Sequence, residues 1–220
     1  MIVLGLAGPA GVGKSTVAAA LAGGDIPIAV GLTPSTVQTG VSPRGVVIGL
    51  ATPLRMMLAA LGVPEEDTRG PAKHAPHPAL DGRTPRHAMQ TLGTEWGRNM
   101  ISPLLWLRAW SYHAQRMTAA LGVDLVVIDD VRFQNEVDYL ALVHGAVVVE
   151  LSRPGVAWSG EHASECGPSA PHCRITMGDG AAPKESARQV LEAAIVADYA
   201  RHQTAARRLD TSLSRIAASE

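Results

Sequence analysis

One short segment near the N-terminus restricts what this chain can fold into more than any other part of the sequence. Residues 8–15 read GPAGVGKS, which fits the pattern G-x-x-x-x-G-K-[ST] at every fixed position. An apolar run at residues 2–7 precedes this glycine loop and is typical of a buried parallel strand. Residues 15–22 follow with a helical pattern that stops at Gly23. A strand, a glycine loop and a helix in this order predict backbone N–H groups and a helix N-terminus that surround a phosphate group.

A loop of this kind predicts the binding of a nucleoside triphosphate together with Mg²⁺. Lys14 is placed to reach the β- and γ-phosphates, and the Ser15 hydroxyl is placed to bind the metal ion. The residues that we expect to contact the triphosphate are Gly8, Ala10, Gly11, Val12, Gly13, Lys14, Ser15 and Thr16.

The composition excludes several other classes of protein. The chain has 220 residues, 46% hydrophobic and 18% charged, which suits one α/β domain with an inserted region or two small domains. A net charge of −1 argues against broad binding of nucleic acid, which needs a basic surface. The sequence shows no signal-peptide pattern and no apolar stretch of membrane-spanning length. We therefore expect a soluble, cytoplasmic protein that binds neither nucleic acid nor membranes.

The rest of the chain alternates between expected strands and expected helices. Further buried strands are expected at residues 46–51, 124–129, 146–151 and 174–177. This order predicts a doubly wound parallel sheet of about five strands, with ligands at the carboxyl ends of the strands. The last helix, from residue 183 to 196, continues as a helical tail rich in Ala and Arg.

Two helix starts are predicted between the second and third strands. Thr52 and Thr84 each precede a proline, and each is expected to be the N-cap of a helix. Residues 63–83 contain four prolines and predict a long mobile loop between these helices.

Helical periodicity then predicts which faces of these helices are packed. With 3.6 residues per turn, the packed face after Thr84 would consist of Met89, Leu92 and Trp96. The other face would present the polar group Arg86, Gln90, Gly93 and Thr94. In the next helix, which begins near Pro103, the expected packing stripe is Trp106, Trp110, His113 and Met117. These aromatic residues are interpreted as core and not as a cofactor site.

Acidic residues follow the third expected strand. Asp129 and Asp130 stand at its carboxyl end, where proteins with such a glycine loop carry an acid that holds Mg²⁺. We predict that Asp130 and Ser15 form the metal side of the site. Asp129 remains the alternative, because adjacent side chains of a strand point to opposite faces.

Arginines gather near strand ends and helix starts. These are Arg55, Arg86, Arg98, Arg132 and Arg153. Guanidinium groups that converge on a transferring phosphoryl group stabilise its charge. The sequence has no obvious His/Asp base pair, which fits an acceptor whose attacking atom is already an anionic phosphate oxygen.

Four segments together resemble the phage-type deoxynucleoside monophosphate kinases, relatives of the adenylate-kinase-like kinases. They are residues 8–15, residues 84–98, the run VIDDVRFQNE at residues 127–136, and Arg153 with residues 162–165. The order and spacing of these segments resemble the family over roughly residues 1–196. The resemblance implies transfer of the ATP γ-phosphate to a deoxynucleoside monophosphate, in the host cytoplasm if the chain is encoded by a phage.

The resemblance also implies roles for particular residues. The catalytic group would be Lys14, Asp130, Arg132 and Arg153, and Arg153 would also contact ATP. The acceptor would lie against Arg55, Arg86, Gln90, Gly93, Thr94, Glu95, Arg98, Arg132 and Glu136. A kinase domain would span residues 1–196, with an acceptor-binding insertion at about 52–121 and a lid loop at about 154–173. Residues 197–220 would form a helical extension that either packs against a second subunit or is solvated.

The sequence departs from the family pattern in two places, and both leave specificity open. The second strand is followed by LATPL at residues 50–54, where the family usually has an aromatic residue and an acid. After the last strand, residues 178–180 read GDG in place of the usual Asn-Gly turn. The base of the acceptor and the choice of donor nucleotide are therefore not predicted.

Other interpretations remain open. Residues of zinc-binding type in the lid are His162, Cys166, His172 and Cys173, but their spacing is not that of a standard zinc site, so we expect free thiols. One alternative function is a kinase for another small phosphorylated acceptor, and another is an ATPase or nucleotide-binding switch. Only a kinase would need the acceptor for its ATP turnover.

Overall fold

The computed structural model divides into two compact units, which are described separately. It describes residues 2–24, 44–160, 166–178 and 180–217, with side chains described as far as residue 205. The sheet unit contains residues 1–47 and 123–220, and the helical unit contains residues 48–122. The expected loop at residues 25–45 lies almost wholly outside the described residues, and so do residues 161–165.

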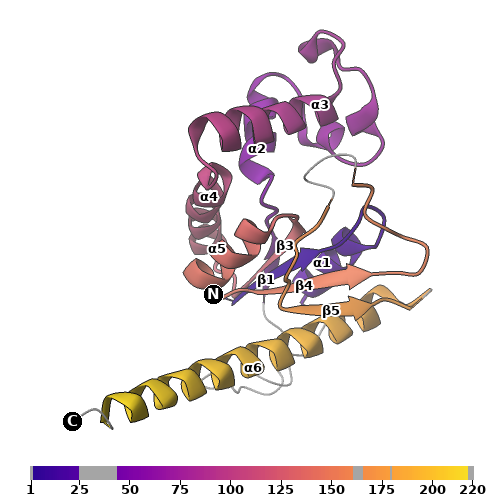
Figure 1. The fold of residues 1–220 in the computed structure, drawn as a ribbon. Coiled ribbons are helices and arrows are strands. Elements are labelled where there is room, and N and C mark those ends of the chain that lie inside the picture. The colour runs from indigo at the N-terminus through magenta and orange to yellow at the C-terminus, as the bar shows by residue number, and fades with distance from the viewer. Residues whose placement is uncertain (1, 25–43, 161–165, 179, 218–220) are drawn as a thin grey trace. The chain divides into compact units, whose positions relative to one another are not determined.

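The sheet unit is built on five parallel strands in the order β2-β3-β1-β4-β5 (Figure 1). The strands are β1 (Ile2–Ala7), β2 (Gly45–Val47), β3 (Leu125–Val131), β4 (Val147–Ser152) and β5 (Cys173–Thr176). Leu4 of β1 pairs with Val127 on one side and Val147 on the other, so β1 is the central strand. The predicted α/β fold with an all-parallel sheet of five strands is confirmed.

Helices cover both faces of this sheet. They are α1 (Lys14–Ala22), α5 (Gln134–His144) and α6 (Pro183–Ala217). Helices α1 and α6 share one core with the strands, in which Leu6, Leu21 and Leu191 are almost fully buried. Helix α5 packs on β1 and β4 and lies on the side of the sheet away from α6 (Figure 1). The helices that follow β1 and β3 therefore lie on opposite faces, as in a doubly wound sheet.

The helical unit consists of short helices around two buried tryptophans. Its elements are α2 (Thr52–Ala60), the 3₁₀ turns η1 (Glu65–Thr68), η2 (Ala72–His74) and η3 (Pro78–Leu80), α3 (Pro85–Gln90), the π-helix η4 (Thr91–Ile101) and α4 (Leu105–Leu121). Trp106 and Trp110 are 6% and 0% exposed, and Leu54 and Leu58 of α2 are buried too. The predicted packing stripe of α4 is therefore confirmed for Trp106 and Trp110, whereas His113 and Met117 are only partly buried.

Several predicted boundaries need correction. The second strand ends at Val47, well before the expected residue 51, and β3 continues through the two aspartates to Val131. Thr52 is the first residue of α2 and not its cap, whereas Thr84 is a cap, since its hydroxyl accepts a hydrogen bond from the His87 amide at 3.1 Å. The expected loop at residues 63–83 contains three 3₁₀ turns, because its prolines favour short turns with fixed φ.

The largest correction concerns the helix after Thr84. It is α-helical only to Gln90 and continues as an eleven-residue π-helix, in which each N–H bonds to a carbonyl five residues earlier. The buried residues are Gly93 and Gly97, while Trp96, expected on the packed face, is 38% exposed. A face derived from 3.6 residues per turn is wrong here because each π turn holds about one residue more than an α turn.

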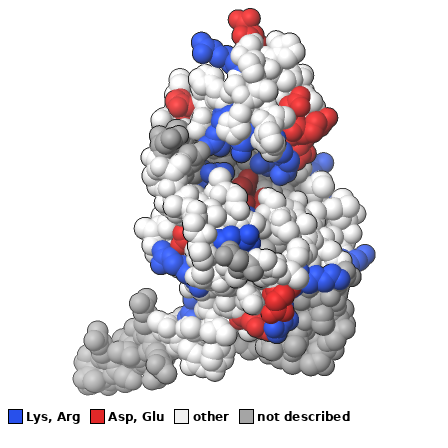
Figure 2. Space-filling model, turned by 90° about the vertical axis from the view of Figure 1, so that its right-hand side faces the viewer, with Lys and Arg blue, Asp and Glu red and all other residues white. Residues whose placement is uncertain are grey.

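The surface carries both signs of charge. On the face shown in Figure 2, Lys and Arg side chains and Asp and Glu side chains occur in separate small groups between uncharged residues. This mixture agrees with the net charge of −1. In the part of the chain that the structure describes, no helix has the length and hydrophobicity needed to cross a membrane.

Candidate functional site

The glycine loop joins β1 to α1 and has a backbone that only glycine can adopt at its key positions. Gly8 has a φ of 142°, and a Cβ atom there would lie 2.5 Å from the carbonyl oxygen of Leu151. Gly13, the residue before α1, has a φ of 106°. Such values are rare for residues with a side chain. The loop is thus packed against the end of β4 and leads directly into the N-terminus of a helix.

Lys14 lies over this loop. Its ammonium group donates hydrogen bonds to the carbonyl oxygens of Gly8 and Pro9, both at 2.7 Å. The positive charge of Lys14 therefore lies beside the glycine loop, and this loop ends at the positive pole of the α1 helix dipole. This arrangement attracts an anion of high charge density, such as a polyphosphate.

Ser15, the next residue, bonds to an aspartate on the neighbouring strand. Its hydroxyl donates a hydrogen bond of 2.7 Å to Oδ2 of Asp129, whose residue is 6% exposed. Asp129 shares the face of β3 with Leu125 and Val127, which pack in the same core as α1. Asp130, the next residue, is partly exposed. The structure therefore joins Ser15 to Asp129, the acid that the sequence analysis left as the alternative to Asp130.

Arg153 lies beside the glycine loop from the end of β4. Its Nη2 atom is 3.6 Å from the position that a Cβ atom would take at Gly13. Its Nε atom is buried and has no hydrogen-bond partner among the described residues. A guanidinium group in this place can donate to an anion bound by the loop. Lys14, Ser15, Asp129 and Arg153 are thus brought together within the sheet unit.

Arg132 and Glu136 belong to the turn between β3 and α5. The Glu136 carboxylate is 3% exposed and accepts hydrogen bonds from the backbone N–H groups of Arg132 and Phe133 at 2.7 and 3.1 Å. An acidic side chain at a helix N-terminus also interacts favourably with the helix dipole. Glu136, predicted to contact the acceptor, therefore fixes the backbone that carries Arg132. The two residues are brought together, and the partly buried side chain of Arg132 extends from this fixed turn.

The other residues predicted to bind the acceptor belong to the helical unit. Arg55 is on α2, with two guanidinium nitrogens buried, and Arg86 and Gln90 are on α3. The π-helix η4 carries Gly93, Thr94, Glu95 and Arg98. Thr94 and Arg98 are partly buried, and Glu95 is exposed. All of these residues lie on α2 or on the continuous segment formed by α3 and η4.

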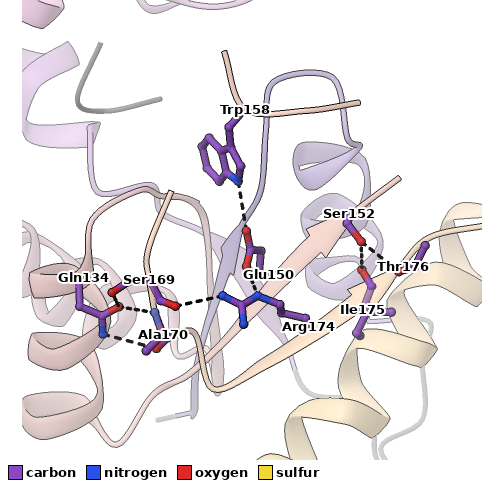
Figure 3. A network of polar contacts seen from close by, with 9 residues as sticks. All are labelled: Gln134, Glu150, Ser152, Trp158, Ser169, Ala170, Arg174, Ile175 and Thr176. Carbon is purple, nitrogen blue, oxygen red and sulfur yellow. Dashed lines mark hydrogen bonds and ion pairs between the residues drawn. The ribbon is translucent and has the colours of Figure 1, made fainter. Parts of the chain in front are cut away.

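A network of polar contacts, not anticipated from the sequence, holds the segment after Arg153 (Figure 3). Glu150 on β4 accepts a hydrogen bond from the indole N–H of Trp158 at 3.1 Å and another from Nε of Arg174 at 2.7 Å. Arg174 also donates to the carbonyl oxygen of Ser169 at 3.1 Å. The Glu150 side chain is 13% exposed, so its ion pair with Arg174 is partly shielded from water.

Gln134, the first residue of α5, holds the other end of that segment. Its Oε1 atom accepts from the amide of Ala170 at 2.7 Å and from the hydroxyl of Ser169 at 3.2 Å (Figure 3). The predicted lid, residues 154–173, is therefore attached to the sheet unit at both ends, and residues 161–165 between them lie outside the described part. An alternation of polar residues in β4 and β5 is the only sequence signal that could have indicated these contacts. Closure of this segment over ATP stays a prediction.

The residues of zinc-binding type have other partners where they are described. Nδ1 of His172 accepts a hydrogen bond from the Val148 amide at 2.8 Å. Burial raises the pKa of the Cys173 thiol to about 11, which disfavours the thiolate that a metal would need. Within the described residues, no group of three or more His, Cys, Asp or Glu side chains is placed to hold a metal ion. His162 lies outside them.

His172 makes a testable contribution to stability. Burial, and secondarily the charge of Arg201 beside its ring, lower the pKa of His172 below 6.5. The unfolded chain then binds more protons than the folded chain just below pH 6.5, so the free energy of unfolding should fall as the pH falls through this window. The expected result is a lower stability towards urea at about pH 5.5 than at about pH 7.5.

The matched variant for this prediction is His172→Gln, which removes the titrating group. The dependence of stability on pH should become weaker but should not vanish, because burial also lowers the pKa of His144. Denaturation of both proteins by urea at the two pH values measures the difference. Equal slopes in the wild type and the variant would contradict the assignment to His172.

The comparisons with known proteins agree with the residues described above. The family model described as "Deoxynucleotide monophosphate kinase" matches residues 81–177. A curated protein of Acanthamoeba polyphaga mimivirus named "Putative deoxynucleotide monophosphate kinase" is 34% identical over 100 residues. The aligned part covers 42% of this chain and 51% of the viral protein, so the chain spans about half the length of that relative.

The stretch matched by the family model carries most of the predicted acceptor residues. It includes Arg86, Arg98, Arg132 and Arg153, while the glycine loop at residues 8–15 lies outside it. The loop and the family match are therefore two separate observations that point to nucleotide chemistry. Together the two matches confirm the resemblance seen in the sequence: over residues 81–177, this chain is similar to the deoxynucleotide monophosphate kinase family.

Proposed function

We propose that this protein transfers the γ-phosphoryl group of ATP to a deoxynucleoside monophosphate. An oxygen of the monophosphate attacks the γ-phosphorus, the bond from that phosphorus to the β,γ-bridging oxygen breaks, and the products are ADP and a deoxynucleoside diphosphate. The attacking oxygen is already anionic at neutral pH, so the step needs no general base. The observation that carries the proposal is the joining of Lys14, Ser15, Asp129 and Arg153 around the glycine loop.

Each of these residues has a role in the proposed reaction. Lys14 and the loop amides hold the β- and γ-phosphates, and Arg153 donates to the oxygens that gain charge during transfer. Mg²⁺, when bound, neutralises phosphate charge, and the hydroxyl and carboxylate oxygens of Ser15 and Asp129 are ligands of the type it prefers. Asp130, the next residue of β3, remains a proposed contact of the reacting groups, together with Arg132.

The proposed function predicts that ATP turnover depends on an acceptor. ADP release from ATP and Mg²⁺ should be measured with each deoxynucleoside monophosphate in turn, including 5-modified pyrimidines, and with no acceptor as the control. Turnover that requires one or more of these acceptors would support the kinase and identify its substrate. Steady ATP hydrolysis that no acceptor changes would contradict it and would favour an ATPase or a nucleotide-binding switch.

The two neighbouring aspartates allow a sharp test of the metal side. Asp129→Asn keeps a group that can accept the Ser15 hydrogen bond but removes the charge, so the Mg²⁺ concentration for half-maximal rate should rise by about tenfold or more. Asp130→Asn is expected to lower kcat without this change in Mg²⁺ dependence. A titration of the initial rate with Mg²⁺ measures both. A higher Mg²⁺ requirement in Asp130→Asn, but not in Asp129→Asn, would assign the metal role to Asp130 instead.

A further inference from the structure

The π-helix η4 is an unusual element that carries predicted acceptor residues. It holds Thr94, Glu95 and Arg98 over eleven consecutive residues, and the bond from the Ser102 amide to the Gly97 carbonyl, at 2.9 Å, continues its five-residue spacing. Extended π-helices are rare because their hydrogen bonds and packing are poorer than those of α-helices, and short ones are frequent at functional sites. Something outside the helix must therefore stabilise this register.

Trp106, in the first turn of α4, makes the contacts that stabilise the π-helical register of η4. Its indole N–H donates a hydrogen bond of 2.8 Å to the carbonyl oxygen of Gly93. The same ring fills the space beside Gly97, where an added Cβ atom would lie 2.6 Å from Cε2 and 2.7 Å from Cζ2 of the indole. Gly93 and Gly97 are the two buried residues of η4. One side chain thus contacts both of the positions at which η4 is packed.

The register has a direct consequence for the predicted acceptor residues. Gln90 is the last residue of α3, and Thr94 and Arg98 follow it at intervals of four along η4. Because a π turn contains about one residue more than an α turn, a change to the α-helical register would rotate Arg98 away from its present direction relative to Gln90. The direction of these side chains therefore depends on what holds η4.

We propose that Trp106 is a positioning residue for the acceptor: by holding Gly93 and Gly97, it fixes the π-helical register that directs Thr94 and Arg98. This inference rests on the proposed function, and it adds a residue that does not itself contact the substrate. Loss of the indole is expected to change the binding of the monophosphate and to leave the binding of ATP, which the sheet unit is proposed to hold, unchanged.

The chain offers a matched control for each of two variants. Trp110, one turn later in α4, is fully buried and also donates its indole N–H to a backbone carbonyl, that of Ile48, at 2.9 Å. Trp110→Phe therefore removes a similar bond at a place outside η4. Met100→Ala is the control for Gly97→Ala, because it alters η4 at a side chain that is 74% exposed. Both variants place an alanine in the same helix.

The test measures KM for the monophosphate and for ATP with the four variants and the wild type. The acceptor is the monophosphate that the wild type uses fastest. For Trp106→Phe and Gly97→Ala we expect KM of the monophosphate to rise by about tenfold or more, since small misplacements of binding groups have effects of this size. KM of ATP should stay within about twofold in all four variants. Trp110→Phe and Met100→Ala should also keep the wild-type KM of the monophosphate.

Amide hydrogen exchange provides a readout that does not depend on activity. In Trp106→Phe, the amides of residues 91–102 should exchange faster than in Trp110→Phe, which separates a loss of the π-helical register from a general loss of stability. An unchanged KM of the monophosphate in Trp106→Phe, or an equal rise for both substrates, would overturn the role of Trp106. A wild type without monophosphate-dependent turnover would instead overturn the proposed function.

Discussion

Replacing Lys14 by alanine is expected to abolish phosphoryl transfer while the fold stays intact. Lys14 supplies an ammonium group above the glycine loop, where it lies 2.7 Å from two backbone carbonyl oxygens. A positive charge that is already in place where negative charge develops in the transition state contributes strongly to the rate. We therefore expect kcat of Lys14→Ala to fall by at least about 10³-fold. The initial rate of ADP formation at saturating ATP and acceptor measures this.

The control for this variant is Lys184→Ala on the first turn of α6. Lys184 is exposed, and its replacement changes the net charge of the protein by the same amount. This second variant should have the activity of the wild type. Circular dichroism and thermal unfolding of both variants verify the fold. If Lys14→Ala kept nearly full activity with a native spectrum, the glycine loop would not be the site of the triphosphate.

Arg132→Ala is expected to lower kcat by about 10²–10³-fold with little change in the affinity for ATP, because a group that acts mainly in the transition state affects the chemical step. The turn that carries Arg132 should survive the change, since it is the backbone N–H of this residue, not its side chain, that bonds to Glu136. Kinetics at saturating substrates and equilibrium binding of ATP to the variant give the two quantities.

Arg188→Ala is the control for the prediction about Arg132→Ala. Arg188 lies on the exposed surface of α6 and pairs there with Glu185 and Glu192, so its loss removes the same charge without touching the site. Its kcat should equal that of the wild type. Arg132→Lys should recover only part of the lost rate, because an ammonium group cannot donate two parallel hydrogen bonds to a phosphate. An unchanged kcat in Arg132→Ala would remove this residue from the mechanism.

Local sequence signals were sufficient for the sheet unit. The strand and helix around the glycine loop are encoded by neighbouring residues, and the expected parallel sheet follows from the alternation of apolar runs and helical segments. The choice between Asp129 and Asp130 was harder, since both follow the same apolar run. It depends on which side of β3 is covered by α1, and the hydrogen bond from the Ser15 hydroxyl shows that Asp129 reaches that side. The metal role of either aspartate stays a prediction.

The helical unit could be predicted less well, for a physical reason. The register of η4 depends on contacts between Trp106 and the two glycines, which are separated along the chain and meet only after folding. Periodicity with 3.6 residues per turn cannot reveal such a register, so it placed the buried Gly93 on the polar face and the exposed Trp96 on the packed face. The hydrogen bonds of Glu150 and Gln134 were missed for the same reason, since their partners come from distant segments.

The central position of β1 has a consequence for the synthesis of the protein. β1 is translated before its partners β3 and β4, which follow only after the whole helical unit. Contacts between segments so distant in sequence form slowly, and an apolar strand that waits for its partners is exposed to aggregation. Gly8 is packed against the carbonyl of Leu151, so the glycine loop can take its final shape only once β4 has left the ribosome. The glycine loop, although it is translated before the helical unit, therefore becomes functional only after β4 has been made.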